Sequence, residues 1–134
     1  MVTFIDTSAI FAIVDRLDPS HPAVVDAYRR LVPGTLVTHR YVVLEALALI
    51  RRRHGPAATI RVIDDILPTI SVAAVDDETH AVALAEYRAS GGAGPSLVDR
   101  TSFAFMRARR IETAFAVDRD FAVAGFNVIP ASAE

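Results

Sequence analysis

Short apolar segments alternate with longer helix-like segments along this chain, and that alternation constrains the fold more than any other feature. Strands are predicted at residues 2–5, 35–38, 70–75, 113–117 and 126–129. Helices are predicted at residues 8–14, about 19–32, 39–53, 57–67, 76–89 and 96–110, with one further turn around Phe121. Strands that alternate with helices form a parallel sheet covered on both faces. We therefore expect a single domain over residues 1–134, a three-layer α/β/α sandwich with a central, mostly parallel sheet of four to five strands.

Composition removes several classes of chemistry. The chain has no cysteine, which excludes disulfides, cysteine-ligated zinc and thiol catalysis. All 14 basic residues are arginine, so the lysine of a phosphate-binding loop or of a Schiff base is absent. The longest apolar run, from Tyr41 to Ile50, is too short to span a bilayer, and no basic leader precedes an apolar stretch at the N-terminus. We expect a cytoplasmic protein that does not enter a membrane.

Four acidic residues lie at the ends of predicted strands or in or near apolar segments, where an ionised side chain is unusual. Asp6 and Asp118 each follow a predicted strand, Glu45 lies inside the apolar run from Tyr41 to Ile50, and Asp99 lies near the start of a predicted helix. In parallel sheets, ligands bind outside the carboxyl ends of the strands. An ionised carboxylate in an apolar setting is costly unless it is hydrogen-bonded, paired or bound to a cation. Gathered in one pocket, these oxygen ligands suit Mg²⁺ or Mn²⁺.

Each acid also has a structural explanation. Asp6 is a good N-cap for the helix that follows it. Ser96 and Asp99 have the spacing of a capping box, and Asp118 could simply end a strand. Glu45 has the weakest such explanation, because no arginine follows it at helical spacing and a helix that is apolar all round is a buried one. We therefore expect Glu45 to point into a polar cavity.

The remaining charges indicate a basic rim around this acidic centre. The net charge is −2, yet arginines cluster at 51–53 and at 107–110, where they could hold a polyanion. The alternative is that they complement helix dipoles at helix C-termini. The four histidines show no spacing typical of a zinc-binding helix, so we interpret them as surface or capping residues.

With these residues in view, the chain resembles the PIN-domain ribonucleases, and among them the VapC-type toxins of bacterial toxin–antitoxin pairs. The resemblance covers nearly the whole chain. It rests on four motifs in order, which are Ile5-Asp6-Thr7-Ser8-Ala9, the helical Glu45, Val98-Asp99-Arg100-Thr101-Ser102-Phe103, and Asp118-Arg119-Asp120-Phe121 followed by Gly125-Phe126. One departure is Ala116, where many members carry a threonine.

The resemblance implies a Mg²⁺-dependent endoribonuclease in which Mn²⁺ can replace Mg²⁺. It assigns the catalytic and metal-binding roles to Asp6, Glu45, Asp99 and Asp118. Residues that could support these ligands are Ser8, Asp120 and Ser102, and residues that could hold RNA phosphates are Arg100 and Arg107. It also implies a homodimer and a cognate antitoxin that covers an apolar groove near the active site.

Two other functions share part of this pattern. A phosphatase of the haloacid dehalogenase type also begins with an Asp after a strand, but it needs a second Asp where this chain has Ser8, and it needs a lysine. The serious alternative is a catalytically weak PIN domain that acts as an RNA-binding or interaction module, because a sequence shows ligands and not turnover.

Overall fold

The computed structural model describes residues 1–131 and confirms the α/β/α sandwich. Its central sheet contains five strands, all parallel, in the order β3-β2-β1-β4-β5. The strands are β1 (Thr3–Ile5), β2 (Leu36–His39), β3 (Ser71–Ala73), β4 (Thr113–Phe115) and β5 (Asn127–Ile129). All five coincide with predicted strands, and each is short, so most of the chain lies in the helices that cover them.

Seven α-helices occur within residues 1–131. They are α1 (Thr7–Val14), α2 (His21–Arg30), α3 (Arg40–His54), α4 (Pro56–Arg61), α5 (Asp77–Ala89), α6 (Leu97–Arg109) and α7 (Asp120–Val123). None of the helices in this part of the chain is both long and apolar enough to cross a membrane.

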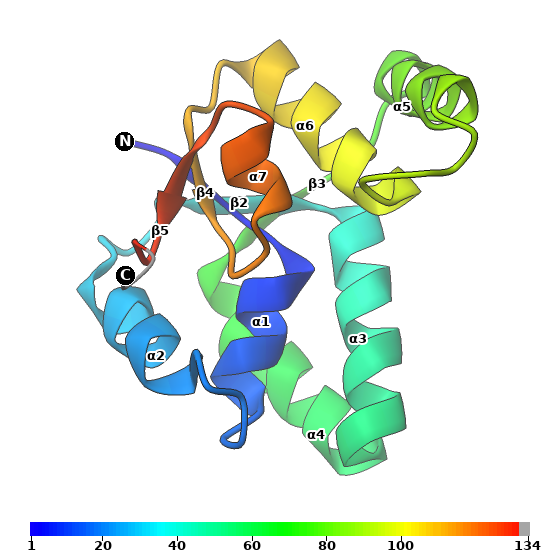
Figure 1. Cartoon of the computed structure of the whole chain (residues 1–134). Coiled ribbons are helices and arrows are strands. Elements are labelled where there is room, and N and C mark those ends of the chain that lie inside the picture. The colour runs from blue at the N-terminus through cyan, green and yellow to red at the C-terminus, as the bar shows by residue number, and fades with distance from the viewer. Residues whose placement is uncertain (132–134) are drawn as a thin grey trace.

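The sheet order explains how the helices are distributed (Figure 1). The connections from β1 to β2 and from β2 to β3 step along the sheet in one direction, and those from β3 to β4 and from β4 to β5 step in the opposite direction. Because such connections are almost always right-handed, the first pair places α1–α4 on one face and the second pair places α5–α7 on the other. The direction changes between β1 and β4, which creates a crevice at the carboxyl ends of these two strands.

The predicted helix at residues 57–67 is helical throughout, but its second half is not an α-helix. The α-helix α4 ends at Arg61, a π-helical turn follows at Val62–Ile66, and a 3₁₀ turn follows at Leu67–Thr69. Pro68 therefore lies inside the last turn and does not stop the helix before it. Proline is tolerated in the first positions of a helical turn, where its missing N–H would have no partner in any case.

The expectation that the segment from Tyr41 to Ile50 is buried all round is also wrong. Val42, Ala46 and Ile50 are fully buried, whereas the Leu44 side chain is 67% exposed. Residues spaced by four share one face of a helix, and α3 buries only that face. Glu45 is half-buried at the edge of this face.

A cluster of aromatic rings connects the sheet to the helices that follow it. Phe121 of α7 is fully buried, and its ring centroid lies 5.0 Å from that of Phe103 on α6 and 6.0 Å from that of Phe4 on β1. Phe126 contacts both Phe103 and Phe121. A one-turn helix is not stable by its own hydrogen bonds, so this packing holds α7 and the preceding Asp118 loop in place.

We predict that Phe121→Ala lowers the free energy of unfolding by about 3–5 kcal/mol, because it leaves a cavity among fixed rings. Val123→Ala is the matched control on the same helix, because Val123 is 81% exposed and its truncation should change stability by no more than about 0.5 kcal/mol. Urea unfolding followed by circular dichroism measures both. Equal effects of the two substitutions would contradict the role given to Phe121.

Candidate functional site

Asp6 and Asp118 lie on the two sides of the crevice between β1 and β4. Asp6 follows the last residue of β1, and its N–H donates to the carbonyl oxygen of Phe115, the last residue of β4, at 3.0 Å. The hydroxyl of Thr38, on β2, donates to the carbonyl oxygen of Ile5 at 2.8 Å. The backbone that carries Asp6 is thus fixed from both neighbouring strands.

One oxygen of the Asp6 carboxylate caps a helix, and the other has no hydrogen-bond partner among the described residues. Its Oδ2 atom accepts hydrogen bonds from the Ser8 N–H at 3.1 Å and from the Ser8 hydroxyl at 2.7 Å, so Asp6 caps α1. Its Oδ1 atom is buried and has no hydrogen-bond partner among the described residues. A buried oxygen without a partner is costly, and an additional ligand at Oδ1 would remove that cost.

Ser8 connects the two sides of the crevice. While its hydroxyl donates to Asp6, its Oγ atom accepts the N–H of Val117 at 3.0 Å. Val117 immediately precedes Asp118. Ser8 therefore fixes Asp6 relative to the backbone that carries Asp118, which is a supporting contact of the kind expected from its place in the motif.

Asp99 closes the site from α6 and also belongs to the capping box of that helix, whose N-cap is Ser96. The Ser96 hydroxyl accepts the Asp99 N–H at 3.1 Å, and the Ser96 N–H donates to Asp99 Oδ2 at 3.3 Å, so the capping box is present. The Asp99 residue is only 9% exposed. One carboxylate oxygen serves the cap, and the other is available to a ligand.

Asp99, Asp118 and Asp120 form a tight acidic group. One carboxylate oxygen from each lies within 4.8 Å of the other two. Asp120 is half-buried, and its N–H donates to Asp118 Oδ1 at 2.9 Å. Asp120, expected only to support the ligands, is therefore as close to Asp99 and Asp118 as a ligand would be.

Electrostatics links this group to the other two acids. The pKa of Asp6 is raised to about 7, mainly by burial and also by the charges of Asp99 and Glu45, while the hydrogen bonds from Ser8 oppose the shift. Burial also raises the pKa of Asp99 to about 6, with the charges of Asp118 and Glu45 acting in the same direction and the Ser96 hydrogen bonds opposing them. Asp6, Glu45, Asp99 and Asp118 thus share one electrostatic environment, although Asp6 and Glu45 lie outside the tightest group.

The donor set fits a hard divalent cation. The groups that converge on the crevice are carboxylates, and oxygen ligands are those that Mg²⁺ and Mn²⁺ prefer. The buried Oδ1 of Asp6, which has no hydrogen-bond partner among the described residues, would gain a partner from such a cation. A cation among these residues would also stabilise the ionised forms that burial and mutual repulsion now disfavour.

The two arginines expected to hold RNA phosphates contact the protein itself. Arg100 donates from Nε to the carbonyl oxygen of Pro95 at 3.2 Å and from Nη2 to that of Ala93 at 3.0 Å, which fixes the glycine-rich loop before α6. Arg107 donates to the carbonyl oxygen of Ala124 at 3.3 Å and lies over the ring of Phe126. Each guanidinium has five N–H donors, so these contacts leave donors free.

His39 is a residue whose importance the sequence did not reveal. The sequence predicts that the histidines are surface or capping residues. His39 does cap α3, but it is fully buried. Its Nε2 atom lies 2.9 Å from the hydroxyl oxygen of Ser102 on α6. A position before a helix predicts a cap, but no pattern in the sequence predicts the partner 63 residues away.

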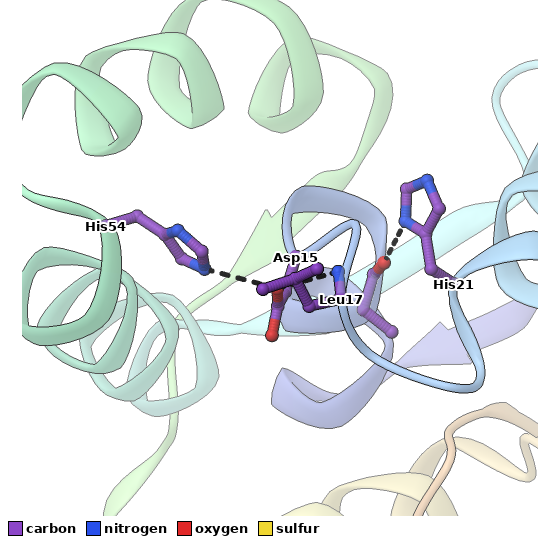
Figure 2. A network of polar contacts seen from close by, with 5 residues as sticks. Asp15, Leu17, His21 and His54 are labelled. Carbon is purple, nitrogen blue, oxygen red and sulfur yellow. Dashed lines mark hydrogen bonds and ion pairs between the residues drawn. The ribbon is translucent and has the colours of Figure 1, made fainter.

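A second polar network fixes the opposite end of α1 (Figure 2). Asp15 Oδ1 accepts the N–H of Leu17 at 3.1 Å and lies 3.7 Å from His54 Nε2 at the end of α3, an ion pair whenever His54 is protonated. His21 Nδ1 lies 2.6 Å from the carbonyl oxygen of Ala12 and so donates to it. These contacts therefore connect α1, whose N-cap is Asp6, to α3, which carries Glu45. They lie at the end of α1 opposite Asp6.

An open cleft of about 770 Å³ is lined by one of the acids, Asp118, and by a residue of β5. Asp118 and Arg119 belong to its lining, together with apolar side chains that include Val117 and Val123. Arg119 is exposed and directly follows Asp118 in the chain.

Comparison with known proteins identifies the family of this chain. The PIN domain family matches residues 3–127, whereas no curated protein sequence matches significantly. Among solved structures, VapC20 of Mycobacterium tuberculosis, described as a sarcin–ricin loop cleaving toxin, is 30% identical with a TM-score of 0.83, over 92% of this chain and 95% of that one. FitAcB of Neisseria gonorrhoeae is 17% identical with a TM-score of 0.72, over 95% and 96%. A toxin–antitoxin complex from Klebsiella pneumoniae is 16% identical with a TM-score of 0.69, over 98% and 99%. This chain therefore belongs to the PIN-domain family and is of the VapC type.

Proposed function

We propose that this protein is a toxin nuclease that hydrolyses phosphodiester bonds of RNA with Mg²⁺ as its cofactor, a role that Mn²⁺ can also fill. The observation that carries the proposal is the unpartnered, buried Oδ1 of Asp6 beside the acidic group formed by Asp99, Asp118 and Asp120. Capping explains one oxygen each of Asp6 and Asp99, and nothing in the described protein occupies the Asp6 Oδ1.

The catalytic roles follow from the placement of the carboxylates. Asp6, Glu45, Asp99 and Asp118 would hold the cation, with Asp120 adding an oxygen from the next turn. A divalent ion supplies an acidified water and stabilises charge on the reacting phosphate. The Ser8 bridge and the Ser96 capping box keep the carboxylates from rotating away, because each holds one carboxylate oxygen by hydrogen bonding.

For the substrate, we propose a structured ribosomal RNA loop. VapC20 is described as cleaving the sarcin–ricin loop and shares 30% identity over nearly the whole chain, so this loop is the first RNA to test. Arg119, which lines the cleft together with Asp118, and Arg100, which has free donors, would hold phosphates of the RNA.

A cognate antitoxin and a second copy of the chain are the proposed partners, as the VapC-type resemblance implies. Apolar side chains that a partner could cover are exposed on α3, on α4 and on the π-helical turn, namely Leu44, Ile60 and Ile63. Exposed apolar clusters on small proteins often mark interfaces. Sedimentation of the purified chain as a monomer at all concentrations would contradict the dimer.

Asp6→Asn and Asp99→Asn should each reduce cleavage of sarcin–ricin loop RNA by at least about 100-fold, because each removes a charged ligand while keeping the shape and the cap. Gel analysis of end-labelled RNA with and without Mg²⁺ measures this. Asp77→Asn is the control, since Asp77 is an exposed acid in the first turn of α5.

If the protein binds the RNA but does not cut it under any metal condition, the catalytically weak RNA-binding module is the better description. Undiminished cutting by either site variant would show that the carboxylates are assigned wrongly. Cutting of other RNAs but not of this loop would overturn only the choice of substrate.

In the absence of metal, we predict that ionisation of the Asp6 carboxyl lowers the free energy of unfolding as the pH rises. Its pKa in the folded protein is about 7, above the ordinary value of 3.8. Between these pH values the folded protein keeps a proton that the unfolded chain has lost, so the free energy of unfolding falls as the pH rises toward 7. Asp6→Asn mimics the protonated acid at every pH. In EDTA it should melt close to the parent at or below about pH 4, increasingly above the parent as the pH rises, and furthest above it near about pH 8. A melting-temperature difference that does not change with pH would exclude this titration.

A further inference from the structure

We propose that His39 is a positioning residue that sets the separation of Glu45 from Asp99, and thereby the affinity of the site for its divalent cation. This inference rests on the proposed function, because it concerns the same cation. It adds a buried connection between the two helices that carry these acids, made by residues that are not themselves ligands.

His39 lies at the point where four elements meet. It is the last residue of β2 and the N-cap of α3, and it is fully buried. Its ring packs against Phe4 of β1, with ring centroids 5.6 Å apart, and edge-on against Phe105 of α6 at 5.4 Å. The ring therefore has little freedom to rotate.

The hydrogen bonds around His39 fix the position of every proton. The N–H of Val42 can only donate, so His39 Nδ1 accepts it, at 3.3 Å, and carries no proton. The neutral ring then has its proton on Nε2, which donates to the Ser102 hydroxyl oxygen at 2.9 Å. Ser102 in turn donates to the carbonyl oxygen of Val98 at 3.0 Å. Burial lowers the pKa of His39 to about 4, in keeping with a neutral ring.

This chain of hydrogen bonds spans the helices that carry two of the acids. Glu45 is six residues beyond His39 on α3, Asp99 is three residues before Ser102 on α6, and Val98 is the neighbour of Asp99. Among the described residues, no other side-chain hydrogen bond joins the start of α3 to α6. Mg²⁺ demands near-ideal ligand geometry, so a small change in this spacing weakens binding more than it weakens the fold.

Two substitutions separate the cap from the bridge. His39→Asn retains an acceptor near the position of Nδ1 but is too short to reach Ser102. His39→Gln retains a donor near the position of Nε2 but presents no acceptor to the Val42 N–H. We expect His39→Asn to bind Mn²⁺ about tenfold more weakly while keeping most of its stability, and His39→Gln to lose stability while keeping most of its Mn²⁺ affinity.

The measurements are Mn²⁺ titration by electron paramagnetic resonance and urea unfolding in EDTA. Ser102→Ala removes only the bridge, so it should also weaken Mn²⁺ binding about tenfold, and combining it with His39→Asn should cause no further loss. Tyr41→Phe is the matched control, since it deletes the neighbouring hydrogen bond from α3 to His80 of α5 and leaves α6 untouched. It should not change Mn²⁺ affinity.

The possible results distinguish this inference from the function on which it rests. If the parent protein binds no Mn²⁺, the metal site and this inference both fall. If the parent binds Mn²⁺ and both His39→Asn and His39→Gln bind it as tightly as the parent does, His39 is only a cap. Mn²⁺ affinity that merely follows stability across all variants would also overturn the positioning role.

Discussion

A carboxylate buried at the end of a parallel strand is the constraint on which this structure depends. The first strand leads Asp6 directly from the core into the crevice between β1 and β4, where it is 3% exposed. An ion placed there loses its hydration, and this loss raises its pKa to about 7. The surrounding contacts from Ser8, Phe115 and the neighbouring strands hold the group in this unfavourable position instead of letting it turn toward solvent.

Capping and cation binding do not compete in this site. Asp6 caps α1, and Asp99 completes the capping box of α6 with Ser96, so the structural explanations that the sequence offers for these two acids are correct. Each carboxylate has a second oxygen, however, and the caps leave it unused. The same hydrogen bonds that stabilise the helix starts also orient the remaining oxygens toward the crevice, which is why a single residue can serve both purposes.

The core and the site are connected through elements that would not be stable alone. The one-turn helix α7 follows Asp118 and is held by the buried ring of Phe121, and α3 begins at the buried ring of His39. Aromatic packing therefore determines where loop carboxylates lie, although no aromatic residue belongs to the acidic centre. This arrangement places ionised groups on rigid supports, as a metal site requires.

The sequence by itself determined the order of elements and which acids are candidates for the site, because hydrophobic periodicity and capping signals are local properties. It could not determine how deeply α3 is buried, how α4 continues through a π-helical turn, or that Asp120 joins Asp99 and Asp118. Only the tertiary structure decided these features and the pairing of His39 with Ser102. The physical reason is that burial and long-range hydrogen bonds arise between segments far apart in the chain, whose packing no local pattern encodes.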